Sequence, residues 1–265
     1  MTCMKRALAL LLCLCALASF ALAEEAAETE APARDAETEK LLEDFTLKHG
    51  SREKKMVAFT VDDCYQERRQ FIEQDVALCN QYGIHMTFFP IYKTGCLQER
   101  YRDIWQSVVD AGCEIGCHGY QHLHLGSFDY WTLIKRLGRW QEELDKTLGY
   151  HYQTRWLRPP YGSIKGGKKL NEKQLVSALK RYGFDHIVHW EVSETHAEKA
   201  IGKIQNGSIL LFHANNKDTK CMEALIPQLL EQGYEIVTIS EMFGFDPPET
   251  SEELYVYDRA NYEDK

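Results

Sequence analysis

Hydrophobic positions in this chain fall into short apolar runs that alternate with longer amphipathic stretches. The short runs are rich in β-branched and aromatic residues, as buried strands are. They lie at residues 55–61, 86–90, 113–117, 154–157, 185–190, 208–212 and 235–238. The helical patterns lie at residues 67–82, 98–111, 131–148, 171–182, 195–204 and 222–232, and most of them stop at a glycine. This alternation predicts an α/β fold, a parallel sheet with helices outside, closed as a barrel or doubly wound.

The one long apolar run stands at the start of the chain. Lys5 and Arg6 precede an apolar stretch over residues 7–21, and Ala21-Leu22-Ala23 has the pattern of a signal-peptidase site. We expect residues 1–23 to be a cleaved signal peptide and the mature protein to be secreted or cell-wall associated, with no stable membrane insertion. The alternative is a retained anchor, for which the run is short.

Charge divides the rest of the chain into three parts. Residues 24–40 and residues 246–265 each contain seven acidic and two basic residues, so we expect an acidic flexible linker and an acidic C-terminal tail. Residues 41–245 form the predicted folded domain, which is almost neutral. The formal net charge of the whole chain is −9, and it disfavours a nucleic-acid partner, because such proteins present a basic face.

Polar side chains follow four of the predicted strands. Sites in α/β folds gather at the carboxyl ends of strands, so we expect these side chains to converge. Each one alone has an ordinary explanation as a turn residue, a surface histidine or part of a rigid loop. Their occurrence together at strand ends favours a functional site. The residues are Asp62, Asp63, His118, His122, Arg158 and His213.

These residue types suit metal-assisted hydrolysis. One aspartate and two histidines form a ligand set for a divalent metal that leaves positions open for water and substrate. A second aspartate then serves as general base, and His213 protonates a leaving amine. Arg158 holds the base carboxylate ionised and oriented, a role that lysine fills poorly.

The motifs around these residues resemble those of the polysaccharide deacetylases of carbohydrate esterase family 4, which contain the NodB-homology domain. The resemblance covers residues 55 to 243 and implies a distorted (β/α) barrel of about seven parallel strands. The matching segments are Phe59-Thr60-Val61-Asp62-Asp63, His118 with His122, Arg158-Pro159-Pro160-Tyr161-Gly162 and Leu211-Phe212-His213.

The resemblance also implies a role for each residue. Asp63, His118 and His122 are the metal ligands, with Zn²⁺ the favoured divalent ion. Asp62 is the catalytic base, Arg158 orients it, and His213 is the general acid. Tyr161 donates its backbone N–H to the oxyanion, while Leu211 and Trp190 line the acetyl pocket; packing in the core is the alternative for Trp190.

The implied function is removal of N-acetyl groups from amino sugars of a cell-wall or extracellular polysaccharide, by a monomer. Peptidoglycan is favoured over another N-acetylglucosamine polymer, because the residues after His213 resemble the branch that acts on muramic acid. Two departures from the family motifs leave alternative functions open. Ser193 replaces an aspartate that supports catalysis in the family, and Ala214 replaces an acidic residue. The alternatives are a weak or inactive glycan-binding domain and a metal amidohydrolase acting on a non-sugar acyl amide.

Six cysteines follow the predicted signal peptide, and an exported protein can form disulfides. They allow 15 pairings, among which the sequence does not decide. Cys64 and Cys117 adjoin two of the implied metal ligands, which makes their pairing one possibility.

Overall fold

The computed structural model describes residues 35–94 and 96–263. The predicted signal peptide and most of the predicted linker lie outside the described residues. Residues 37–265 form one compact unit, which carries the elements discussed below apart from Ala36, the first residue of the first helix.

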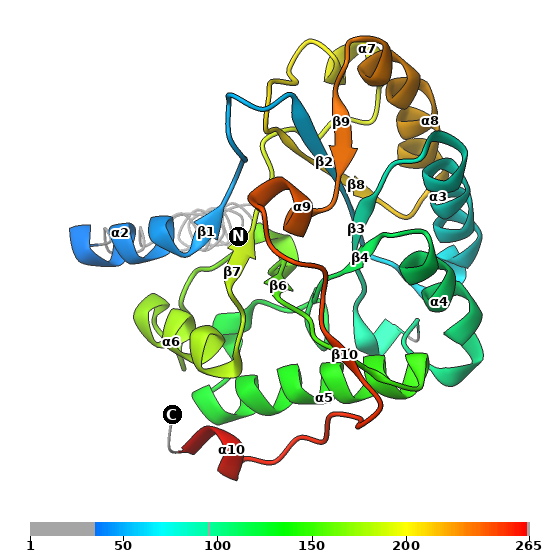
Figure 1. Cartoon of the computed structure of the whole chain (residues 1–265). Coiled ribbons are helices and arrows are strands. Elements are labelled where there is room, and N and C mark those ends of the chain that lie inside the picture. The colour runs from blue at the N-terminus through cyan, green and yellow to red at the C-terminus, as the bar shows by residue number, and fades with distance from the viewer. Residues whose placement is uncertain (1–34, 95, 264–265) are drawn as a thin grey trace, which may run out of the picture. The chain divides into compact units, whose positions relative to one another are not determined.

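Seven parallel strands form the centre of this unit (Figure 1). They are β2 (Met56–Asp62), β3 (Met86–Phe89), β4 (Glu114–Ile115), β6 (Trp156–Leu157), β7 (His186–Val188), β8 (Ile209–His213) and β9 (Glu235–Val237). β4, β3, β2 and β8 lie side by side, with β9 paired to the start of β2, and a second sheet joins β6, β7 and the short β1 (Thr46–Leu47). Each strand corresponds to one of the predicted apolar runs, except β1.

The two sheets close into a distorted barrel. Single parallel bridges connect them on both sides, between Cys117 and Leu157 and between Val192 and Leu210. The predicted barrel is therefore confirmed. In the central sheet Asp62 is the register partner of both Phe89 and His213, so the carboxyl ends of three strands lie at one level.

Six helices surround the strands where the amphipathic patterns predict them (Figure 1). They are α3 (Arg69–Tyr82), α4 (Arg102–Asp110), α5 (Tyr130–Leu148), α6 (Glu172–Tyr182), α7 (Ala197–Ala200) and α8 (Asn216–Glu231). Single turns of 3-10 helix lie at Gln66–Arg68, Tyr92–Thr94, Glu99–Tyr101, Leu125–Ser127 and Pro160–Gly162. The largest difference is in α8, which begins six residues before the predicted start because the Asn215 side chain caps it, accepting from the N–H groups of Lys217 and Asp218.

Several short elements have no counterpart in the sequence patterns. They are α2 (Ala36–Asp44), β1, β5 (His151–Tyr152), α9 (Ile239–Phe243), β10 (Thr250–Ser251) and α10 (Ala260–Glu263). α2 overlaps the predicted linker. β10 pairs with β5, and the backbone N–H groups of Tyr255 and Tyr257 donate to Asp145 and Glu142 on α5, so the acidic C-terminal segment is packed against the domain.

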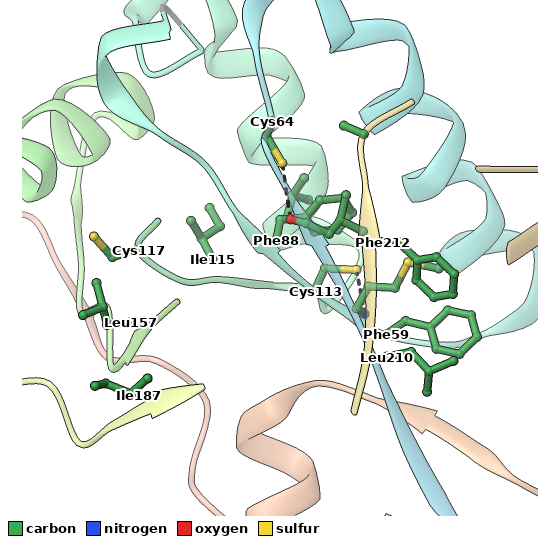
Figure 2. Close-up of a cluster of buried hydrophobic side chains, with 14 of the residues drawn as sticks. Phe59, Cys64, Phe88, Cys113, Ile115, Cys117, Leu157, Ile187, Leu210 and Phe212 are labelled. Atoms are coloured by element: carbon green, nitrogen blue, oxygen red, sulfur yellow. Dashed lines mark hydrogen bonds between the residues drawn. The ribbon is translucent and has the colours of Figure 1, made fainter. Parts of the chain in front are cut away.

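Buried aromatic and aliphatic side chains fill the barrel and the layer beneath the helices (Figure 2). The rings of Phe59 of β2 and Phe212 of β8 pack at a tilt of 55°, with their centroids 5.1 Å apart. β2 is buried along almost its whole length, as a parallel strand covered on both faces must be. This packing fixes the strand whose end carries Asp62 and Asp63.

No disulfide joins the cysteines of the described residues. The Cys64 thiol donates to the Val61 carbonyl, and Cys117 accepts from the Gly119 N–H, so the pairing suggested from the sequence is not formed. The Cys113 thiol donates to the Cys79 sulfur, with 3.5 Å between the two sulfurs. None of the helices in the described segments has the length and apolarity needed to span a bilayer.

Candidate active site

The carboxyl ends of the barrel strands bring the predicted site residues together. Asp62 ends β2 and Asp63 follows it, while His213 ends β8 beside Asp62 in the ladder. His118 follows β4 and Arg158 follows β6, and their segments are joined by the hydrogen bond from the Arg158 N–H to the Cys117 carbonyl. The short strands therefore place side chains from four separate segments on one rim.

Asp63, His118 and His122 form the predicted metal-ligand set. Their nearest ligand atoms all lie within 4.8 Å of one another. His118 Nε2 is 3.6 Å from Asp63 Oδ1, and His122 Nε2 is 3.7 Å from the same oxygen. This oxygen is buried and accepts no hydrogen bond from the described residues. An unpartnered buried carboxylate oxygen between two imidazole nitrogens fits a divalent cation, because burial of a bare charge is otherwise costly.

Contacts behind the ligands fix their orientation. His118 Nδ1 lies 2.7 Å from the Arg158 carbonyl, so this nitrogen carries the proton and Nε2 keeps its lone pair for a metal. The His122 ring meets the Tyr161 ring edge-on at 4.2 Å, and the Tyr161 hydroxyl donates to the His122 carbonyl. Burial is the main cause that lowers the pKa of His122, which favours the neutral imidazole that binds metals.

Two residues of the site have strained backbones. Asp63 has φ 53° and Tyr161 has φ 61°, and they are the two non-glycine residues with positive φ in the described part of the chain. Such conformations cost about 1–3 kcal/mol each and persist where the surroundings impose them. Asp63 is itself a candidate metal ligand and Tyr161 contacts another, His122, which is where functional strain is expected.

Asp62 is held by a buried arginine, as predicted for a catalytic base. Arg158 Nη1 lies 3.1 Å from Asp62 Oδ1 and 3.3 Å from Oδ2. Both side chains are almost fully buried, with 0% and 4% of their surface exposed. The Asp62 carboxylate also lies near His118, with 3.7 Å between Asp62 Oδ2 and His118 Nε2. The guanidinium charge thus compensates the carboxylate next to the ligand set.

Arg158 has all its donors engaged. Nε donates to the Val188 carbonyl at 2.6 Å, and Nη2 donates to Thr60 Oγ1 and to the His189 carbonyl. Burial lowers the pKa of Arg158, and the charge of Asp62 opposes this. These contacts tie the arginine to β2 and β7, so it positions Asp62 rigidly.

His213 has a partner that the sequence reasoning missed. Its backbone N–H donates to Asp218 Oδ2 at 2.7 Å, and its Nδ1 lies 3.2 Å from the same oxygen. The hydrogen bond to Asp218 is the main cause that raises the pKa of His213. A raised pKa keeps the imidazole protonated at higher pH, which suits a general acid. Asp218 escaped notice because the sequence pattern starts its helix too late.

Tyr161, Trp190 and Leu211 lie around this rim, and their contact with a substrate stays a prediction. The Tyr161 side chain is 59% exposed and Leu211 is buried at 7%. Trp190 packs against Gly162, where a Cβ atom would meet the indole ring at 2.5 Å, so only glycine fits that position. Trp190 also lies over the Arg158 guanidinium at 5.2 Å. The indole therefore forms part of the wall behind the Asp62–Arg158 pair.

Known proteins match this chain in sequence and in fold. Residues 49–187 match the polysaccharide deacetylase family. The protein YlxY of Bacillus subtilis, described as uncharacterized, is 25% identical over 202 residues, which are 73% of this chain and 59% of YlxY. The peptidoglycan-N-acetylmuramic acid deacetylase PdaC of Bacillus subtilis is 24% identical over 198 residues, 71% of this chain and 38% of PdaC. The chain thus spans less than two thirds of either relative.

Solved structures match over most of the domain. A CE4 family pseudoenzyme from Bacillus anthracis has a TM-score of 0.63 and 21% identity, over 74% of this chain and 68% of that chain. At this identity the likeness supports the fold alone. The family match covers more than half of the sequence and includes five of the six converging residues. The chain belongs to the polysaccharide deacetylase family.

Proposed function

We propose that this protein is a metal-dependent deacetylase that removes N-acetyl groups from amino sugars of a cell-wall or extracellular polysaccharide. The single observation that carries the proposal is the Asp63–His118–His122 cluster beside an aspartate held by a buried arginine. A structural metal site would not need the second carboxylate. A hydrolase needs both a metal and a base.

The ligand set fits a divalent ion with nitrogen and oxygen ligands, and Zn²⁺ is the favoured one. Asp63, His118 and His122 would hold it. When bound, such an ion polarises the acyl oxygen of the substrate and increases the acidity of water. These three residues come from the end of β2 and from the loop after β4.

The other residues of the rim perform the proton transfers. Asp62 accepts a proton as water attacks the carbonyl carbon of the acetamide, and Arg158 holds its carboxylate in place. The Tyr161 backbone N–H is the proposed donor to the oxyanion that forms. His213 then donates its proton to the amine nitrogen as the C–N bond breaks. The products are acetate and a free amino sugar.

Peptidoglycan is the favoured substrate within this class. The residues after His213 resemble the branch that acts on muramic acid, and PdaC is named for an activity on N-acetylmuramic acid. We further propose that residues 1–23 direct export, that residues 41–245 form the catalytic domain, and that the mature protein acts as a monomer outside the cytoplasm. An exported enzyme would meet this substrate directly.

Acetate release tests the proposal. The mature chain from residue 24 is offered peptidoglycan fragments and an N-acetylglucosamine oligomer, each with added Zn²⁺. We expect acetate from at least one of them, and its loss in Asp62→Asn. Asp246→Asn, an exposed aspartate outside the rim, is the matched control and keeps the activity.

Two alternatives predict other outcomes. A glycan-binding domain without turnover, which the likeness to a pseudoenzyme keeps in view, binds the fragments and zinc but releases no acetate. An amidohydrolase for non-sugar acyl amides leaves both glycans intact and cleaves a small N-acetyl amide. Either result contradicts the proposed function.

A further inference from the structure

The carboxylate of Asp218 contacts the candidate general acid from behind. Its Oδ2 atom accepts from the His213 backbone N–H at 2.7 Å, lies 3.2 Å from His213 Nδ1, and accepts from Asn215 Nδ2 at 3.1 Å. A carboxylate oxygen accepts several donors, so the three contacts are compatible. The side chain is 4% exposed, and its second oxygen is buried with no partner in the described residues.

Hydrogen bonds of Asn215 also hold the segment that contains Asp218. Asn215 caps α8 through its Oδ1 atom, which accepts from the Lys217 and Asp218 N–H groups. Its amide nitrogen donates to Asp218 and to the His213 carbonyl, so Asn215 links the cap to the end of β8. The carboxylate and the imidazole are thus fixed relative to one another by backbone contacts as well as by their own.

The nearby carboxyl group of Asp75 does not replace Asp218 as the partner of His213. Asp75 on α3 is fully buried and accepts from Thr219 Oγ1 at 2.9 Å. Burial raises the pKa of Asp75 to about 8, so it is mostly protonated at neutral pH. Asp218 is then the carboxyl group that meets His213 from the helix side, while the charges of Asp62 and Asp63 also raise the pKa of His213 from the rim.

We propose that Asp218 is the positioning residue of His213, holding the proton of the neutral imidazole on Nδ1 so that Nε2 exchanges the proton with the leaving amine. The catalytic part of this inference rests on the proposed function, whereas the tautomer does not. Ser193, where the family resemblance expects a supporting aspartate, is exposed. The support for His213 therefore comes from the first turn of α8.

A purely structural role for Asp218 must be distinguished from this one. An acid in the first turn of a helix interacts favourably with the helix dipole, whatever it contacts. Asp103 in the first turn of α4 is the matched control, because it is exposed and pairs with Arg69. If Asp218 had only a structural role, Asp218→Asn and Asp103→Asn would both change the stability of the protein and leave kcat unchanged.

The first measurement uses the unmodified mature chain. Long-range ¹H–¹⁵N NMR spectra, with His213 assigned by comparison with His213→Gln, report which ring nitrogen carries the proton in the neutral form. We expect Nδ1 in the wild type. A neutral His213 protonated on Nε2 would overturn the inference, and this result needs no activity and no variant of Asp218.

The second measurement separates binding from turnover. Asp218→Asn should lose the Nδ1 preference and lower kcat by about 10- to 100-fold, part of what a general acid contributes, with KM unchanged. Asp218→Glu should restore part of kcat, and Asp103→Asn should keep all of it. A folded Asp218→Asn with wild-type kcat contradicts the inference. If the wild type releases no acetate, the proposed function fails, and the tautomer still decides the role of Asp218.

Discussion

Strands β4 and β6 carry two buried polar clusters, one at each end of the barrel. At their amino ends, Glu114 of β4 accepts from the Trp156 indole of β6 at 2.7 Å and from the Ser240 hydroxyl, the Ser240 N–H and Thr87. At their carboxyl ends, His118 and Arg158 meet through the 2.7 Å contact between Nδ1 and the carbonyl. Both clusters contain a buried carboxyl group, but their chemistry differs.

The amino-end cluster is satisfied by neutral donors. Each Glu114 oxygen has a partner, and burial raises the pKa of this carboxyl above its ordinary value. The carboxyl-end cluster combines full charges with an unpartnered oxygen on Asp63 and a strained backbone at the same residue. Complete satisfaction indicates a structural role, and unmet hydrogen-bonding capacity indicates a place for a ligand. Four predictions test this difference.

The largest effect is expected for Asp63→Asn. The change keeps the shape, and asparagine tolerates a positive φ, but the anionic ligand is lost. Bound Zn²⁺ should become substoichiometric. Acetate release should fall by about 10³-fold or more, since a metal contributes several kcal/mol and each 1.36 kcal/mol is tenfold. Metal analysis and an acetate assay measure these effects.

The same variant should not weaken the metal-free fold. Removing an unpartnered buried carboxylate relieves a desolvation cost, so the free energy of unfolding in chelator should stay the same or rise. Urea unfolding of both proteins provides the comparison. Asp63→Asn protein that retains one zinc per chain would show that the cluster is not the metal site.

The second effect concerns stability at the active-site rim. Arg158→Met leaves Asp62 buried without its countercharge and should lower the free energy of unfolding by about 3–5 kcal/mol. Arg155→Met is the control. Its pair with Asp185 is partly exposed, so the loss should be about 1 kcal/mol or less. Equal losses in urea unfolding would mean that Asp62 does not depend on Arg158.

The sequence predicts the barrel well because the barrel depends on long-range burial. The seven apolar runs match seven parallel strands, since a strand covered on both faces must be apolar throughout. The short elements were not predictable in this way. β5 and β10 are two residues each, and they pair across almost a hundred residues of chain, so no local period marks them.

The candidate site likewise contains some residues that the sequence predicts and others that it does not. The residues at the strand ends are predictable because the fold brings carboxyl ends together. Asp218 and Glu114 are not, because their roles depend on which groups they meet. Asp218 stands in a helical turn whose start is set by the Asn215 cap, and Glu114 opens a strand read as apolar. Only three-dimensional contacts distinguish such acids from surface acids.

The third effect is expected at the amino-end cluster. Glu114→Gln places an amide NH₂ against one of the donors that now point at the carboxyl, and an unmatched buried polar group costs about 1–3 kcal/mol. Stability should fall by that amount, with kcat and zinc content unchanged. Urea unfolding and the acetate assay test both parts. Lost activity in a folded Glu114→Gln protein would make this cluster part of the catalytic machinery.

The smallest effect is the pH dependence that Glu114 imposes. Burial raises the pKa of Glu114 in the folded state above its ordinary 4.5, so the folded protein binds this proton more tightly than the unfolded chain does. The resulting stability is fully present below pH 4.5 and is lost as the pH rises through the folded-state pKa. Over that window the wild type should lose up to about 1.4 kcal/mol per pH unit relative to Glu114→Gln.

Urea unfolding of both proteins between acidic and neutral pH gives the difference directly, because Asp75 and the rim carboxylates are common to both. Parallel pH curves for the two proteins would mean that Glu114 ionises as freely in the folded state as in the unfolded one, and the contrast between the two ends of β4 would then disappear.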